Sequence, residues 1–441
     1  MHLLINPLGA LLLTVTVSAA PVAQEPADEP VLLIKAEKVI ERPGKVIENG
    51  QVLVRGGRIV AVGTDVDAPD GARVIEGKVV CAGFIDAWSS FGLTSGAVRS
   101  TDTKPHTRSV DAFDAFSGED RRADALRAGV VAACVQAGGR ATIGGLSAVL
   151  RVAGGEGLVL LDDAALGAAV GLSGDAFEQV GQVDSLVNQI GAGLKYREDW
   201  VEYRHELKAW QDKIAEEEAK LEKDSKKAAK DRDKKKKEAE DEGKEFKEKS
   251  YKEDRKPKVP KFDDEKEVLA RVAHGEVPLI VQARGVVELR ELLRATRDFD
   301  RLRLVIAGGA DALHVAEELV ARSIPVIVHP APTGGPDVDL SLAGRLAEEK
   351  VEVLLGSGGG DELADLPLLA AIAIGHGLEA DAALHALTLG AARALDLADR
   401  LGSVSRGRQA DLLVLDGEPL RSSTRVRYVL SNGQVVVSPE D

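Results

Sequence analysis

The sequence predicts an α/β protein in which strand–helix units build a barrel-like parallel sheet and the two chain ends supply a small β-sheet domain. Three observations lead to this expectation. Apolar runs alternate with helical patterns from about 79 to 398, which is typical of parallel βα units. Short β-like runs with turn residues fill 31–80 and return in 399–437. A segment between the ends, 196–261, is overwhelmingly charged and breaks the alternation.

Hairpin turns are predicted at both ends of the chain. Asn49-Gly50 and Gly56-Gly57 lie between β-like runs near the N-terminus, and Asn432-Gly433 does so near the C-terminus. Such pairs favour the tight turns of β-hairpins. Neither set of strands is large enough for a stable core alone. We therefore expect 31–80 and 399–437 to form one composite β-sandwich domain.

The second half of the barrel region, 81–398, has the clearest periodicity. Apolar strands such as PLIVQA, RLRLVIAGG, IPVIVHP and VEVLLGSGGG are each followed by a helical pattern. The predicted helices span 285–297, 310–322, 341–349 and 366–376. This regular alternation predicts a barrel.

The charged segment is predicted to be a long helical insertion with coiled-coil-like character. Its Glu, Asp and Lys residues alternate at helical spacing, which supports a solvated helix. Near its start, Trp200, Tyr203, Leu207 and Trp210 recur on one face and are expected to pack on the barrel.

Composition and the N-terminus limit the function. The net charge of −15 argues against binding to nucleic acid. The apolar run Leu8–Val17 followed by small residues predicts a signal peptide over 1–23 and export to the periplasm or the extracellular space. No later run is long enough for a transmembrane helix. Cys81 and Cys134 are either buried thiols or one disulfide bond.

Several motifs together resemble a known family. RGGRIVAVG precedes a strand that ends in GFID, and the chain closes with LGSVSRGRQADLLVLDGEPL and NGQVVV. This arrangement resembles the amidohydrolase superfamily, in particular its imidazolonepropionase-like and dihydroorotase-like hydrolases. The resemblance implies a metal-bearing (β/α)8 TIM-like barrel with a small β-sandwich made from both chain ends. It also implies Zn²⁺ or another divalent metal that activates water for hydrolysis.

The family's metal-ligand positions are occupied by other residues in this chain. They hold Trp88, Ser90, Gln282, Gly308 and Gly358. None of these side chains offers the imidazole or carboxylate that a zinc site uses. The resemblance therefore implies a barrel whose metal positions are vestigial, with no cofactor expected. We also expect the indole of Trp88 to fill the space that a metal site would leave.

Two functions remain open. The first is an exported amidohydrolase-like protein without metal-dependent hydrolysis, which binds a small molecule or a partner protein. Its partner would be a second copy of the chain or an active homologue. The alternative is an active hydrolase of carbon–nitrogen bonds, such as those of cyclic amides, that works through an atypical site. Asp86 and Asp361 are its candidate catalytic residues.

Overall fold

The computed structural model describes residues 31–115, 118–139, 141–155, 157–171, 174–242, 255–330, 338–358 and 363–440, with only the backbone given for 221–242. The predicted signal peptide and the candidate Asp361 lie outside these residues.

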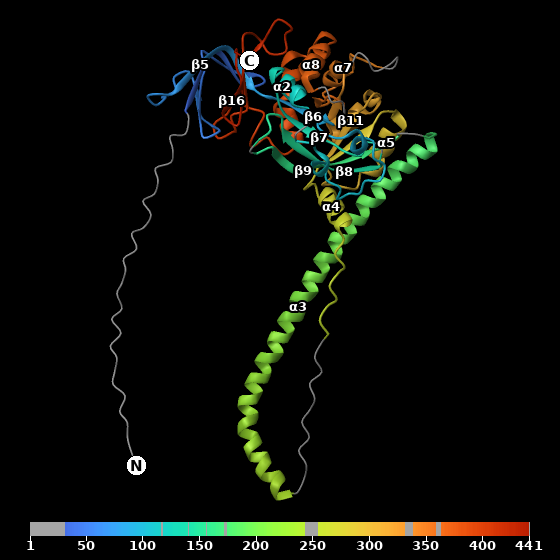
Figure 1. Cartoon of the computed structure of the whole chain (residues 1–441). Coiled ribbons are helices and arrows are strands. Elements are labelled where there is room, and N and C mark those ends of the chain that lie inside the picture. The colour runs from blue at the N-terminus through green and yellow to red at the C-terminus, as the bar shows by residue number, and fades with distance from the viewer. Residues whose placement is uncertain are drawn as a thin grey trace, which may run out of the picture.

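One sheet of eight strands is built from both ends of the chain (Figure 1). Its order is β16-β15-β14-β5-β1-β3-β4, and β2 pairs with β1. β5 lies between the two ends, because it pairs with β1 in parallel and with β14 in antiparallel orientation. The strands are β1 (Leu32–Arg42), β2 (Lys45–Glu48), β3 (Gln51–Arg55), β4 (Arg58–Gly63), β5 (Arg73–Ala82), β14 (Leu412–Leu415), β15 (Val426–Ser431) and β16 (Gln434–Val437).

This sheet curls until its far regions meet. The N–H of Ile59 donates to the carbonyl of Arg408 (2.9 Å), and the N–H of Ala410 donates to the carbonyl of Gly57 (2.8 Å). Apolar side chains from both chain ends then share one small core. The expectation that the two ends form one domain core is confirmed, although a single curled sheet builds it.

One predicted hairpin is wrong. Gly56-Gly57 and Asn432-Gly433 connect paired antiparallel strands, as expected. At Asn49-Gly50 the chain bends and continues along the same neighbour, since β2 and β3 both pair with β1. The N–H of Ala36 donates to the carbonyl of Gly50 (2.9 Å), so β1 holds both sides of the bend. Asn49 adopts the left-handed conformation (φ 50°), which here produces a bend within one continuous course of the chain and not a hairpin turn.

The second sheet is a nearly closed barrel of eight strands in the order β13-β12-β11-β10-β9-β8-β7-β6. It consists of β6 (Phe84–Ser89), β7 (Val130–Val135), β8 (Ile143–Arg151), β9 (Val159–Ala169), β10 (Leu279–Ala283), β11 (Leu304–Gly308), β12 (Val326–Val328) and β13 (Val353–Leu355). The α/β barrel joined to a small sheet is therefore confirmed.

The barrel departs from a strict (β/α)8 repeat at one strand. β8 is antiparallel to both β7 and β9, whereas every other neighbouring pair is parallel. The connections 136–142 and 152–158 are too short for the crossover helix that parallel strands need. Consequently β8 ends at the base of the barrel, beside the small sheet.

Helices follow the later strands much as predicted. They are α5 (Val286–Ala295), α6 (Ala316–Ala321), α7 (Leu342–Glu348), α8 (Leu366–Gly375), α9 (Ala380–Leu387) and α10 (Leu389–Ala394). Shorter or earlier helices are α1 (Ser95–Val98), α2 (Glu119–Arg127) and α4 (Asp264–Ala273), and 3-10 turns cover Ser109–Ala112, Ala312–Val315 and Leu363–Asp365. Leu289, Leu292 and Leu293 of α5 are fully buried in the main core.

The charged helix is longer than its charge pattern predicts. α3 (Ala176–Glu242) has 67 residues and projects far from the barrel (Figure 1). The helix begins well before the predicted start at residue 196. Its first turns are apolar on one face, and Val183, Leu186 and Ile190 are fully buried against the main core. The predicted aromatic stripe is less buried than these three residues. Trp200 is half-buried and lies edge-on to Tyr203, with ring centroids 5.9 Å apart. No helix in the described part of the chain has the length and hydropathy to cross a membrane.

Candidate functional site at the barrel end

The five positions predicted to correspond to family ligands lie at the carboxyl ends of barrel strands. Trp88 and Ser90 are at the end of β6, and Gln282 is near the end of β10. Gly308 ends β11, and Gly358 follows β13. Since β6, β10, β11 and β13 run in the same direction around the barrel, the structure brings these positions to one end of it.

Asp86 occupies the seam where the barrel closes. The sheet has no ladder between its first and last strands, β6 and β13. The Asp86 carboxylate accepts from the N–H of Trp88 (3.0 Å) and, across the seam, from the N–H of Ser357 (3.1 and 3.3 Å). Its side chain is fully buried. Asp86 therefore ties β6 to the loop after β13.

Burial also changes the acidity of Asp86. Desolvation raises the pKa of this carboxyl from 3.8 to about 7, although the hydrogen bonds from Ser357 and Trp88 act in the opposite direction. A carboxyl with such a pKa would suit a general base. With no exposed surface, however, Asp86 has no path to a substrate in this conformation.

Trp88 is half-buried and packs against the main core. The backbone of the neighbouring loop approaches it closely, because a Cβ added at Gly356 would lie 3.1 Å from the carbonyl oxygen of Trp88. This contact and the Asp86 hydrogen bonds secure the same seam. That the indole takes the place of a metal remains a prediction.

Two of the five positions have backbones suited to glycine. Gly308 has a φ of +92° and Gly358 a φ of +72°, a region that residues with a Cβ rarely adopt. A Cβ at Gly358 would also lie 2.6 Å from the ring of His329. A histidine at 308 or an aspartate at 358 would therefore require the local backbone or His329 to move.

His329 is an imidazole that lies beside Gly358. It follows β12, is exposed, and its Nδ1 lies 3.0 Å from the carbonyl oxygen of Gly356. Among the described residues, no three or more His, Cys, Asp or Glu side chains gather closely enough to hold a metal ion. The described residues at this barrel end therefore do not fit the divalent metal that the family implies.

Gln136, at the end of β7, is a buried polar residue that sequence reasoning missed. Its Nε2 donates to the carbonyls of Ala137 (2.7 Å) and Gly145 (3.3 Å), whereas its Oε1 has no partner among the described residues. A Cβ at Gly167 would lie 2.1 Å from the Gln136 amide carbon. Gly167 in β9 and Gly144 in β8, whose added Cβ would lie 3.1 Å from the Gln136 Nε2, were the sequence signal for this close packing.

The two cysteines do not offer a nucleophile. Cys81 and Cys134 are both free and buried. Burial raises the pKa of each thiol to about 12, so the reactive thiolate is scarce at neutral pH. The interpretation of both as buried thiols is confirmed.

Comparisons with known proteins agree with this fold. Residues 362–437 match the amidohydrolase family. An amidohydrolase from Thermotoga maritima MSB8 is similar in structure, with a TM-score of 0.68 and 23% identity over 92% of this chain and 100% of that one. A Xaa-Pro dipeptidase with bound methionine has a TM-score of 0.52 and 13% identity over 92% and 99% of the two chains. An A. niger ochratoxinase has a TM-score of 0.51 and 14% identity over 93% and 96%. No curated protein matches the chain.

Proposed function

We propose that this chain, a member of the amidohydrolase superfamily, is an exported protein that binds a small molecule or a protein partner and does not hydrolyse by means of a metal. The observation that carries the proposal is the glycine backbone at two of the five ligand positions. Gly308 and Gly358 adopt positive φ values that disfavour any metal-ligating side chain. At these two positions, both the residue type and the local backbone conformation disfavour a metal ligand.

The other three positions support the same proposal. Trp88, Ser90 and Gln282 offer an indole, a hydroxyl and an amide, none of which is a strong ligand for Zn²⁺. The barrel end is instead held by packing and hydrogen bonds at the seam between β6 and β13. The Asp86 hydrogen bonds and the contact between Gly356 and Trp88 stabilise this end of the barrel.

Export is part of the proposal and rests on the apolar run Leu8–Val17 and the small residues after it. N-terminal sequencing of the exported protein tests it, with Gln24 as the expected first residue.

The alternative is a hydrolase of cyclic amides in which Asp86 activates water without a metal. The observation that favours it is the pKa of about 7 at Asp86. Against it stand the complete burial of this side chain and the two backbone N–H groups that it already accepts from.

Hydrolysis of dihydrouracil and hydantoin, assayed with and without added Zn²⁺ or Mn²⁺, separates the two functions. We expect no turnover above the rate in buffer, because the described residues of the barrel end include no set of metal ligands and the Asp86 side chain is fully buried. The matched control is Asp86→Asn, which keeps the shape of the side chain. Turnover that disappears in this variant would establish the alternative, and turnover that needs added metal would contradict the loss of the metal site.

A further inference from the structure

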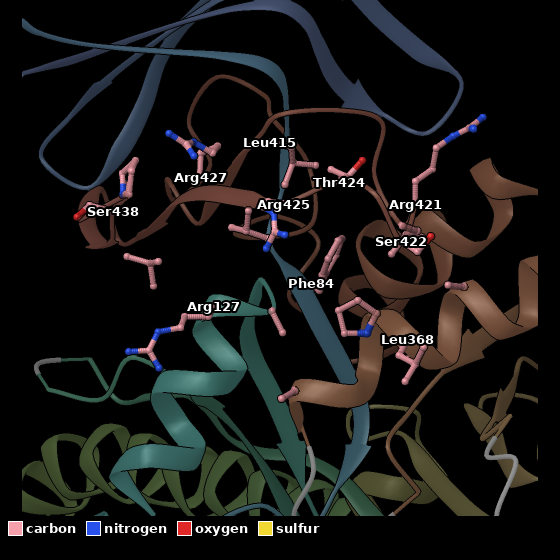
Figure 2. Close-up of a pocket in the computed structure, with 18 residues that line it drawn as sticks. Phe84, Arg127, Leu368, Leu415, Arg421, Ser422, Thr424, Arg425, Arg427 and Ser438 are labelled. Atoms are coloured by element: carbon pink, nitrogen blue, oxygen red, sulfur yellow. The ribbon is translucent and has the colours of Figure 1, made fainter. Parts of the chain in front are cut away.

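A cavity of about 640 Å³ lies between the base of the barrel and the small sheet. It is bounded by the start of β6, the end of α2, the start of α8 and the C-terminal strands (Figure 2). Its volume is in the range of small-molecule sites. Phe84 begins β6, whereas the vestigial metal positions follow the opposite ends of the strands, so this cavity is distinct from the candidate site.

Much of the cavity wall is apolar. Side chains from three separate parts of the chain line it, namely Phe84, Pro367, Leu368, Leu415, Leu420 and Val426. Leu368 remains 58% exposed although it belongs to an apolar helix. An apolar wall of this kind gains free energy when a ligand removes it from water.

The charged residues that line the cavity are all arginines. Arg127, Arg421, Arg425 and Arg427 are among its lining residues, and no described lining residue is acidic. This is notable in a chain whose net charge is −15. Cations gathered at an apolar cavity favour a ligand that carries a negative charge.

Arg425 is the arginine placed to bind that charge. Figure 2 shows its side chain directed between Leu415 and Phe84, whereas Arg421 turns away from the cavity. The backbone N–H of Arg425 donates to Asp416 (2.7 Å), which holds this residue in place before β15. Its guanidinium has no acceptor among the described residues. Arg127, on the opposite wall, forms an exposed pair with Asp124 (3.1 Å).

We propose that this cavity binds a small amphipathic anion, a carboxylate with an apolar body such as a medium-chain fatty acid. The carboxylate pairs with the guanidinium of Arg425, which can donate two parallel hydrogen bonds. The apolar body lies against Phe84, Leu368 and Leu415. This inference goes beyond the function proposed for the barrel end and does not depend on it.

Isothermal titration of the full chain with octanoate and with 1-octanol tests the proposal. We expect octanoate to bind with a stoichiometry of one per chain and more tightly than 1-octanol. Arg425→Gln should raise the dissociation constant of octanoate about tenfold, because one charge-assisted pair is lost. The same variant should leave the affinity for 1-octanol unchanged.

Two control variants make the result specific. Arg421→Gln removes an equal charge that points away from the cavity, so it should change octanoate affinity less than about twofold. Ala371→Trp, which adds bulk to the cavity wall, should weaken both ligands. An absence of octanoate binding, or equal losses in the Arg425 and Arg421 variants, would overturn the proposal. Thermal unfolding of each variant checks that it is folded.

Discussion

Asp411→Ala is expected to lower the free energy of unfolding by about 3–5 kcal/mol, because it leaves Arg151 as an unpaired buried charge. The side chains of Arg151 and Asp411 are only 4% and 3% exposed and form an ion pair. Arg151 also donates to Ser431 (3.0 Å) and Gln409 (3.1 Å). Arg151 ends β8 in the barrel, whereas its three partners belong to the C-terminal part of the chain. The pair therefore joins the barrel to the small sheet.

A double-mutant cycle measured by urea unfolding tests this coupling. Burial raises the pKa of Asp411, and the nearby Arg151 guanidinium opposes that change. Arg151→Met should thus also be destabilising, since it leaves a buried carboxyl without its cation. The double variant Arg151→Met/Asp411→Ala should lose less than the sum of the two single variants, because no charge remains unpaired. Additive losses, or single losses below about 1 kcal/mol, would show that the pair does not join the two parts.

Asp86→Asn is expected to become more stable relative to the wild type as the pH rises. Folding raises the pKa of Asp86 from its ordinary value of 3.8, which applies to the unfolded chain, to about 7. A carboxyl whose pKa is raised by folding contributes most stability below its ordinary pKa. That contribution is lost as the pH rises toward 7, since the unfolded chain ionises first. Between pH 5 and pH 8 the difference between variant and wild type should change by roughly 2–3 kcal/mol.

Urea unfolding of both proteins at these two pH values measures the effect. Comparison of the wild type with Asp86→Asn isolates the titration of Asp86, because the two proteins share all other titrating groups. Asp86→Ala is the matched test of the seam, since it removes the acceptor of two backbone N–H groups. It should cost about 3 kcal/mol at pH 5, where the wild-type side chain is protonated. A difference between Asp86→Asn and wild type that is the same at both pH values would mean that Asp86 titrates normally.

Local patterns were sufficient to predict most elements of this fold. The helical period of 285–297 predicted α5, and the pairs Gly56-Gly57 and Asn432-Gly433 predicted two hairpins. These features depend on residues close in sequence. Asn49-Gly50 has the same local signal, yet long-range pairing of both flanking strands with β1 turns it into a bend.

Features that depend on distant residues were not predictable in the same way. The antiparallel direction of β8 follows from the shortness of its two connections, which could have been noticed. This direction brings Arg151 to Asp411, and the two residues of this ion pair are 260 positions apart in the sequence. Likewise, Asp411 belongs to the closing stretch that contributed to the family resemblance, but only the structure shows that Asp411 serves the contact between barrel and small sheet. The prediction that five positions are vestigial required the family resemblance, because glycine and tryptophan carry no signal of a lost ligand.

The divalent metal content of the purified full chain tests the central claim most directly. After incubation with Zn²⁺ and removal of unbound ions, elemental analysis should find far less than one equivalent per chain, because the part of the barrel end that the structure describes offers no adequate set of ligands. One equivalent of zinc that resists removal, and that is lost when Gln282 or His329 is replaced by alanine, would contradict the account.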